Sequence, residues 1–584
     1  MPAAPLAAVT AIAAGALLLA PGVRAAGPPI MTLDQVQVGM RCTVASVVRG
    51  TDVATFDARV EDVLRSRDPT STRLLVRVSG PAIDATGIGP GFSGSPISCT
   101  GIDGVPRIAA AISEGIGEYG GKLALATPIE AILGEPADPP AGARVASALL
   151  RRARPLAEPL TMSGLAPPLA AAFSRAAARA HRTLVVAPAI ARAAQEFPVP
   201  LVPGSAVAVS MATGDVTSGA IGTVAYVDGD RVWAFGHALD GAGRRSLTLS
   251  NAYVSTVVSN PVASSEDNTY KLASPLADIG TLVQDGVNAV VGRVGPLPRR
   301  YPLRVVTRDL DRGIRRELGS QVADERPVGS PTGGSGLAVL ASALASQAAY
   351  VTLQGLPANL SGRVCLRVAV TERRGPLGFC STYVGAGGGP EAFTSGPVVA
   401  DLAAAAKLLD AYDAGPLRIS SVTIGMRLTR ALRLGTLVRA TAPALVRRGT
   451  TARVTLTLRR AGGGRFTRDV LVSVPRTMPV GTRDLLLTGT AADGPLPSGG
   501  DISLSDLFST ADVPPPPSTL PALASAIASL HRDDGLGARF LHRGAPAPTR
   551  LPGGAEGIAE RRRVIFRSDA LRLAGRVRVA LRVR

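Results

Sequence analysis

Short segments in which hydrophobic and polar residues alternate recur along the chain and predict a mainly β protein. The clearest one runs from Val454 to Arg459, where valine and leucine alternate with threonine and arginine. Residues two apart in a strand face the same side, so this pattern is typical of a strand with one buried face. Similar segments separated by turns fill residues 415–490, and their regular spacing predicts an immunoglobulin-like β-sandwich.

Hydrophobic residues at helical spacing, and one run rich in alanine, predict helices in other parts of the chain. The predicted helices are Ala170–Arg182, Leu337–Ala349, Val398–Tyr412 and Leu520–Leu530. The changes of pattern divide the chain into seven parts. They are a signal peptide (1–26), a first β-rich half (36–135), a helical connector (140–203), a second β-rich half (204–310), a mixed α/β segment (337–412), the sandwich (415–490) and a C-terminal segment (500–584).

The beginning of the chain predicts export. Residues 6–20 are small and apolar, and residues 21–25 provide an A-x-A-like exit, as in a secretory signal peptide. We therefore expect the protein in the periplasm, in the cell envelope or outside the cell. An uncleaved anchor at residues 6–20 is the alternative. No later stretch is expected to span a membrane, which takes about 20 apolar residues.

Four cysteines fit an exported protein. Cys42 opens the first β-rich half, and Cys99 follows a candidate site described below, so a bridge between them would join the two ends of this region. Cys365 and Cys380 fall on two strand-like segments separated by a turn. The positions predict disulfides Cys42–Cys99 and Cys365–Cys380. Four unpaired buried thiols are the alternative.

The charge is strongly positive, but it does not indicate nucleic-acid binding. The net charge is +19, and all but three of the 63 basic residues are arginine, spread along the chain. Only 3% of the residues are aromatic, so platforms for stacking bases are scarce. We expect weak attraction to anionic material and peripheral association with the cell envelope. With four histidines and no C-x-x-C or H-E-x-x-H motif, neither a metal nor another cofactor is expected.

One motif carries the candidate chemistry. In Gly91-Phe92-Ser93-Gly94-Ser95-Pro96 a serine lies between glycines, after a strand-like segment. Glycine permits the positive φ angles of a sharp turn that exposes a serine hydroxyl. In the chymotrypsin-type arrangement, the N–H groups of Gly91 and Ser93 would form an oxyanion hole for a nucleophilic Ser93. An ordinary turn is the alternative interpretation, and Ser95 is the alternative nucleophile.

A second motif lies later in the chain, where Ile221-Gly222-Thr223 is followed by a turn and then by Gly236-His237. The two motifs together resemble the SpoIVB sporulation peptidases, a family of chymotrypsin-like serine peptidases whose nucleophile segment reads G-M-S-G-S-P-I. Phe92 stands here in place of the methionine. The resemblance implies a chymotrypsin-like double β-barrel with Ser93 as nucleophile and His237 as general base. A histidine at a strand end, bonded to backbone, is the alternative interpretation of His237.

The two halves stand in the opposite order to that of the family. There the histidine half comes first, whereas here Ser93 precedes His237. This order predicts a circular permutation, which proteins tolerate when the new termini fall in exposed loops. Pairing of the halves between two chains is the alternative.

The acid of a Ser-His-Asp triad has no counterpart at the expected place. The resemblance places it at Val78 or Ser79, neither of which is acidic. The third triad member is therefore unknown. Asp84, the nearest carboxylate before the nucleophile, is one candidate, and Asp240 is another. Loss of the orienting acid can lower kcat by about 10⁴.

The export signal and the resemblance together predict an exported serine endopeptidase. The resemblance further implies limited or regulatory cleavage of a protein or peptide, and it suggests cleavage of the chain itself. The alternative is a catalytically inactive envelope scaffold or peptide-binding protein that keeps the peptidase fold. The missing acid and the long β-rich C-terminal half favour this alternative. A secreted adhesin or polysaccharide binder is a third interpretation, which the scarcity of aromatic residues disfavours.

Overall fold

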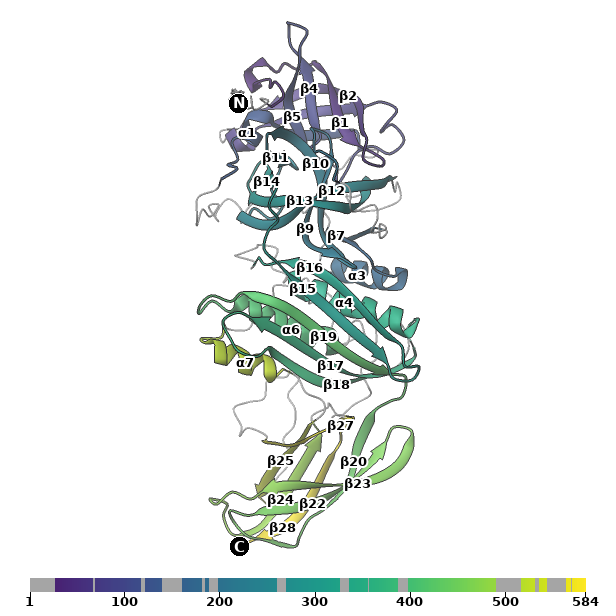
Figure 1. Cartoon of the computed structure of the whole chain (residues 1–584), viewed down its shortest axis with the longest axis vertical. Coiled ribbons are helices and arrows are strands. Elements are labelled where there is room, and N and C mark those ends of the chain that lie inside the picture. Colours follow the sequence, from purple (N-terminus) through teal and green to yellow (C-terminus); the bar gives the residue numbers. More distant parts are fainter. Residues whose placement is uncertain are drawn as a thin grey trace, which may run out of the picture.

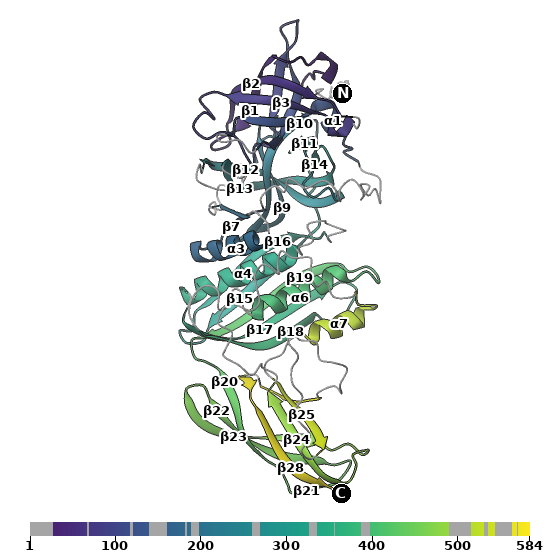
Figure 2. The same cartoon turned by 180° about the vertical axis from the view of Figure 1, so that it is seen from behind.

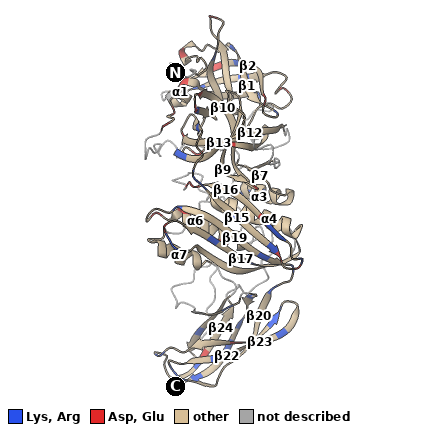
Figure 3. Ribbon diagram, in the orientation of Figure 1, with Lys and Arg blue, Asp and Glu red and all other residues tan. Residues whose placement is uncertain are grey.

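The computed structural model shows an elongated, mainly β molecule whose parts follow one another along its long axis (Figures 1 and 2). Lysine and arginine residues, coloured blue in Figure 3, occur along its whole length. The structure describes residues 27–66, 69–116, 121–138, 160–180, 184–187, 198–259, 269–325, 336–355, 357–386, 397–489, 516–530, 535–542, 563–568 and 570–584. The predicted signal peptide at 1–26 lies outside these residues.

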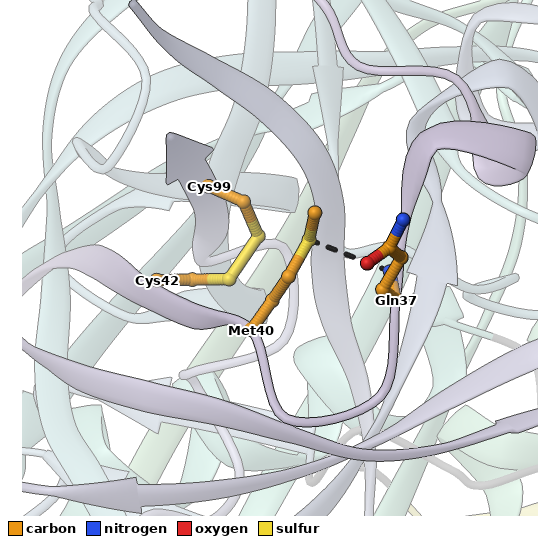
Figure 4. Close-up of a disulfide and its surroundings, with 4 residues drawn as sticks. All are labelled: Gln37, Met40, Cys42 and Cys99. Carbon is orange, nitrogen blue, oxygen red and sulfur yellow. Dashed lines mark hydrogen bonds between the residues drawn. A yellow bond between two sulfur atoms is a disulfide. The ribbon is translucent and has the colours of Figure 1, made fainter. Parts of the chain in front are cut away.

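Six strands of the first β-rich half form a closed barrel in the order β1-β2-β3-β6-β5-β4. Its elements are η1 (Leu33–Gln35), β1 (Arg41–Val47), β2 (Val53–Leu64), η2 (Pro69–Ser71), β3 (Arg73–Ser79), β4 (Pro96–Thr100), β5 (Pro106–Gly115), β6 (Leu123–Pro128) and α1 (Ile129–Leu133). Alternation along β1 and β3 places Val44 and Val76 in the barrel core. Strand β4 pairs with β1 and closes the barrel, and the disulfide Cys42–Cys99 joins these two strands beside Met40 (Figure 4).

The second β-rich half repeats this arrangement. Its strands are β9 (Ala206–Gly214), β10 (Thr217–Asp228), β11 (Arg231–Ala234), β12 (Gly243–Ser259), β13 (Thr269–Asp285) and β14 (Val290–Val294). Hydrogen-bonded pairs run β9-β10-β11-β14-β13-β12 and return from β12 to β9, so these strands also form a closed ring. Counted from the first strand of each half, the order of pairing is the same in both rings.

The second ring continues into a thirteen-stranded sheet, whose order is β18-β17-β19-β15-β16-β9-β12-β13-β14-β11-β10-β7-β8. The added strands are β7 (Leu160–Ser163), β8 (Leu184–Ala187), β15 (Arg300–Asp309), β16 (Arg315–Ala323), β17 (Asn359–Val370), β18 (Leu377–Ala386) and β19 (Ile419–Thr429). The second predicted disulfide, Cys365–Cys380, is also present and joins β17 to β18.

Two predicted boundaries need correction. The segment 140–203, predicted as a helical connector, contributes the parallel strands β7 and β8 as well as a helix. Strand β19, expected in the sandwich, instead pairs with β15 and β17 in the thirteen-stranded sheet. Alternation of hydrophobic residues identifies a strand but not its partner, which tertiary packing decides.

Helices pack on the part of this sheet that lies beyond the second ring (Figure 2). They are α3 (Pro167–Arg179), α4 (Gly336–Leu353), α6 (Pro397–Ala411) and α7 (Leu520–Ala528), close to the predicted ranges. Among the described residues, α4 is the one helix that is long and apolar enough to cross a membrane, judged by length and composition alone. The sequence-based expectation that no segment after residue 26 meets this criterion is therefore corrected. Most of α4 is buried in the core between the sheet and the other helices.

Two smaller sheets form the C-terminal part, with the orders β23-β22-β20-β27 and β21-β28-β24-β25-β26. The strands are β20 (Leu434–Thr441), β21 (Leu445–Val446), β22 (Thr451–Arg460), β23 (Gly463–Ser473), β24 (Gly481–Gly489), β25 (Gly535–His542), β26 (Arg563–Arg567), β27 (Arg572–Ala574) and β28 (Arg576–Val583). Leucine and valine side chains of both sheets share one core, as in a sandwich. Strands β25 to β28 belong to the segment 500–584, which therefore completes the sandwich instead of forming a separate part.

Each disulfide is expected to stabilise the fold by an amount that increases with the length of the loop that it closes. Cys42–Cys99 closes a loop of 57 residues, and Cys365–Cys380 closes one of 15. In the chain-entropy model, replacing both cysteines by serine costs about 4 kcal/mol for the first pair and about 3 kcal/mol for the second. Denaturant unfolding of the two double variants under oxidising conditions measures these losses. Variants as stable as the wild type would contradict the pairing.

Candidate functional site

The two candidate residues lie in corresponding loops of the two rings. Ser93 lies between β3 and β4, and His237 lies between β11 and β12, which in each case are the third and fourth strands of the ring. Both residues are nearly buried, with 5% of Ser93 and 7% of His237 exposed. Contacts between the rings bring these two distant segments of the chain together.

Thr223 of β10 links both loops through its main chain. Its N–H donates to the Ser93 carbonyl at 2.8 Å, and its carbonyl accepts the N–H of Phe235 at 3.2 Å. Phe235 stands two residues before His237. One residue of the second ring thus holds the serine loop with its N–H and the histidine loop with its carbonyl.

A second link comes from the first barrel. The Ile112 carbonyl of β5 accepts the Gly94 N–H at 2.6 Å, and the Thr127 hydroxyl of β6 donates to the Gly236 carbonyl at 2.7 Å. A Cβ on Gly236 would lie 2.9 Å from the Ile112 carbonyl oxygen, so the absence of a side chain permits this approach. The serine and histidine segments are therefore joined within one chain, and no second chain is required to bring them together.

Two glycines with positive φ shape the turn around Ser93. The φ angle is 93° at Gly91 and 91° at Gly94, a region that residues with a Cβ rarely adopt. A Cβ on Gly94 would also lie 1.9 Å from the carbonyl oxygen of Thr223. Phe92 is completely buried and anchors the turn in the core of the first barrel. The motif thus forms a turn that only this placement of glycine allows.

The directions of the Gly91 and Ser93 N–H groups follow from the carbonyls of the preceding residues, because each N–H shares a peptide plane with that carbonyl. The Pro90 carbonyl accepts an N–H from β13 at 2.9 Å, and the Phe92 carbonyl accepts the Ser95 N–H at 2.9 Å. In a trans peptide the C=O and N–H bonds point in opposite directions, so these contacts fix both N–H directions. Within the described parts of the chain, the Gly91 N–H has no acceptor. It is therefore available to a developing oxyanion.

The chain enters the histidine loop in an unusual conformation. Phe235 and Gly236 both have a φ angle of 70°. This left-handed region is rare for an aromatic residue, and such strained residues cluster at functional sites. The Phe235 ring packs where Gly222 lacks a side chain, since a Cβ there would lie 2.3 Å from a ring carbon. Gly222 of the second motif therefore makes room for the residue that leads to His237.

A backbone carbonyl sets the tautomer of His237. Its Nδ1 lies 2.7 Å from the carbonyl oxygen of Ala238. Because a carbonyl can only accept, Nδ1 carries the proton in this bond, and the lone pair of the neutral ring is on Nε2. This is the tautomer that a general base for a serine requires.

A buried aspartate holds the chain that follows His237. The Asp285 carboxylate forms an ion pair with Arg245 at 3.3 Å. Burial raises the pKa of Asp285, and the positive charge of Arg245 opposes this rise. The same carboxylate accepts three main-chain N–H bonds at 2.7 to 3.2 Å, from Leu239, Asp240 and Ala242. The histidine loop is thus fixed on both sides of the imidazole.

The structure does not support Asp84 as the third triad member. Asp84 is exposed, and its carboxylate accepts the Lys122 ammonium at 3.0 Å and the Gly80 N–H at 3.1 Å. The hydrogen bond from Lys122 is the main reason why the pKa of Asp84 is lowered. The other candidate, Asp240, pairs with Arg245 at 3.1 Å. The carbonyl described above occupies the place beside Nδ1 that the acid has in a triad.

Burial argues against Ser95 as the alternative nucleophile. Ser95 has no exposed surface, and its hydroxyl lies 2.8 Å from that of Ser46, which is also completely buried. A nucleophile must reach a substrate carbonyl, so Ser93 remains the candidate. Ser95 instead belongs to a buried polar layer between the two rings, which consists of Ser46, Ser95, Thr223 and Lys271.

The sequence patterns assign no role to three polar residues of this layer, which are Lys271, Ser46 and Thr223. Lys271 is 3% exposed and donates to the hydroxyl groups of Ser46 at 2.8 Å and Thr223 at 2.9 Å. A lysine within a mostly apolar strand segment, in a chain with only three lysines, is a signal that sequence reasoning could have used. Its partners lie far away in the sequence, so the layer itself was not predictable.

Comparison with protein-family models, with curated proteins and with solved structures found no match to this chain. The assignment of the site therefore rests on its geometry. Throughout the described residues, no three or more His, Cys, Asp or Glu side chains gather in a way that could hold a metal ion. The chemistry that the site offers is that of serine, imidazole and main-chain N–H groups.

Substitution by alanine is expected to lower the stability of the fold by different amounts at Gly104 and Gly94, although the two glycines have similar φ angles. Gly104, with a φ of 76°, has open space at its Cβ position, whereas a Cβ on Gly94 meets backbone. Gly104→Ala should cost about 1 kcal/mol, from its left-handed conformation alone. Gly94→Ala should cost about 3 kcal/mol, because the turn must also move. Urea unfolding of both variants measures the difference, and equal losses would contradict this packing.

Proposed function

We propose that the chain is an exported serine endopeptidase of the SpoIVB type, built on a permuted chymotrypsin-like double barrel. The observation that carries the proposal is the junction at Thr223, which holds the Ser93 loop of one ring against the His237 loop of the other. Two rings of equal connectivity, each with one candidate residue in the same loop, support this fold. The two disulfides are compatible with an extracytoplasmic protein.

In the proposed reaction, Ser93 Oγ attacks the carbonyl carbon of a peptide bond while His237 Nε2 takes its proton. The former carbonyl oxygen becomes an oxyanion held by the N–H groups of Gly91 and Ser93. The amine product leaves with the proton from His237, and an acyl-enzyme remains on Ser93. Water, deprotonated by the same imidazole, then releases the carboxylic acid and restores the serine.

The carbonyl of Ala238 would orient His237 in place of a carboxylate. It selects the tautomer, but it stabilises the imidazolium formed during the reaction less than a full negative charge does. We therefore expect slow turnover. Slow turnover suits limited or regulatory cleavage better than bulk digestion, and the chain itself is a candidate substrate.

The low exposure of the site favours an extended substrate. Ser93 and His237 expose only 5% and 7% of their surfaces, so a folded protein cannot approach both without local opening. An extended segment needs less room around the serine than the surface of a folded protein does. The proposed substrate class is therefore a flexible segment of a protein, or a peptide.

A second candidate function is peptide binding without catalysis, by a scaffold that keeps the fold. The observation that favours it is the carbonyl at His237 Nδ1, where an active triad has an acid. The sheet that continues from the second ring to the helix-covered part also suits a scaffold. In this case the Ser93 turn would bind a peptide carbonyl with its N–H groups but would not cleave it.

Hydrolysis of an unfolded protein substrate separates the two candidates. Ser93→Ala should remove cleavage, and His237→Gln should lower kcat/KM by about 10³-fold or more, because the proton acceptor is lost. Ser95→Ala is the control for the same turn and should keep the rate within about tenfold, since its hydroxyl only pairs with another hydroxyl. A wild-type protein that binds peptides but never cleaves them would establish the scaffold instead.

A further inference from the structure

A lysine lies buried between the two rings, below the serine turn. Lys271 belongs to β13 of the second ring and is 3% exposed. Its ammonium donates to the hydroxyl groups of Ser46 at 2.8 Å and Thr223 at 2.9 Å, and lies 4.5 Å from the centre of the Phe92 ring. Desolvation of an ammonium is costly unless partners of this kind are held in place. The aromatic ring adds a cation–π contact.

Lys271 also contacts the three residues that precede Ser93. Its main-chain N–H donates to the Pro90 carbonyl at 2.9 Å. Gly91 lies against its side chain, where an added Cβ would be 2.8 Å from the Cβ of Lys271. Phe92 lies under its ammonium. All three residues that lead to the nucleophile therefore contact Lys271.

The hydroxyl groups extend the contact to both sides of the nucleophile. Thr223 accepts from the ammonium and donates its own hydroxyl proton to the Gly91 carbonyl at 2.9 Å. Ser46 also accepts from the ammonium, and its oxygen lies 2.8 Å from the Ser95 hydroxyl. One hydroxyl group thus connects the ammonium to Gly91, and another connects it to Ser95.

A Ser–Lys catalytic pair does not account for this cluster. Ser46, to which the ammonium donates, has no exposed surface, and neither has Ser95, which lies beside Ser46. A substrate carbonyl cannot reach either oxygen. The cluster therefore acts on the turn above it and not directly on a substrate.

We propose that Lys271 is a positioning residue that holds the turn between Pro90 and Ser95, and with it the N–H groups of Gly91 and Ser93, in the orientation that an oxyanion requires. This inference rests on the peptidase function proposed above. Without the ammonium, the Thr223 hydroxyl loses its donor, and the Gly91 carbonyl is held less firmly. The turn then gains freedom, and the N–H groups are no longer pre-organised for the oxyanion. Removal of one oxyanion-hole donor lowers kcat by about 10²–10³, which bounds the expected effect.

Burst kinetics with a p-nitrophenyl ester on the full chain test the proposal, because the burst amplitude counts competent sites and the rate constant reports acylation. Lys271→Met keeps the length of the side chain and the main-chain N–H. It should lower the acylation rate constant by about 10²-fold at full amplitude, with KM changed by no more than about threefold. Lys122→Met is the matched control, since it removes an exposed lysine of the first barrel, and should leave both values unchanged.

Thr223 provides a second variant that keeps the test decisive if Lys271→Met does not fold. Thr223→Val removes the hydroxyl bond to Gly91 but keeps the main-chain junction, and should lower the rate constant about tenfold. Thr223→Ser keeps the hydroxyl and should restore the wild-type rate.

Three outcomes would overturn the inference. An unchanged rate constant in Lys271→Met, or in Thr223→Val if the first variant does not fold, would refute it and leave the peptidase proposal intact. A lower amplitude with an unchanged rate constant would assign Lys271 a purely structural role. A wild type that neither hydrolyses the ester nor forms an acyl-enzyme would refute the peptidase proposal and this inference together.

Discussion

The main chain of Thr223 joins the two rings, and the geometry of the candidate site depends on this junction. Its N–H and carbonyl bond the Ser93 carbonyl and the Phe235 N–H, so backbone groups set the distance between the two loops. Backbones approach this closely only where side chains are absent, which explains the glycines at positions 94 and 236. A larger residue at either position would push the loops apart, whatever its polarity.

A buried polar layer below the junction makes the turn rigid. Hydroxyl groups and one ammonium replace the apolar contacts that would otherwise fill the space between the rings. A buried network whose members are satisfied specifies one arrangement, because every displacement breaks a bond in a medium of low dielectric. The left-handed Phe235 adds strain that this packing must hold in place. Rigidity of this kind is what pre-organised N–H groups require.

Local patterns predicted the elements, but they did not predict how the elements pair. The alternation of hydrophobic residues identifies the strands. The positions of Cys42 and Cys99 on either side of the candidate serine, and of Cys365 and Cys380 on either side of a turn, predict the two disulfides that are present. The Ile419–Thr429 strand shows the limit, because it pairs with a strand at Arg300–Asp309 that no short-range pattern could indicate. The same holds for Lys271, whose partners Ser46 and Thr223 lie in different rings or distant strands. Asp84 is the nearest carboxylate before Ser93 along the chain, but in the fold its carboxylate pairs with Lys122 at the surface.

The central claim is that one chain assembles a reactive serine from two halves in swapped order. The most direct test is to treat the folded protein with a serine-directed fluorophosphonate and to locate the adduct by peptide mapping. Our account predicts an adduct on Ser93 that forms only in the folded chain and disappears when His237 is replaced by glutamine. An adduct on Ser95, an adduct that forms equally well without the imidazole, or no adduct on the folded wild type would contradict it.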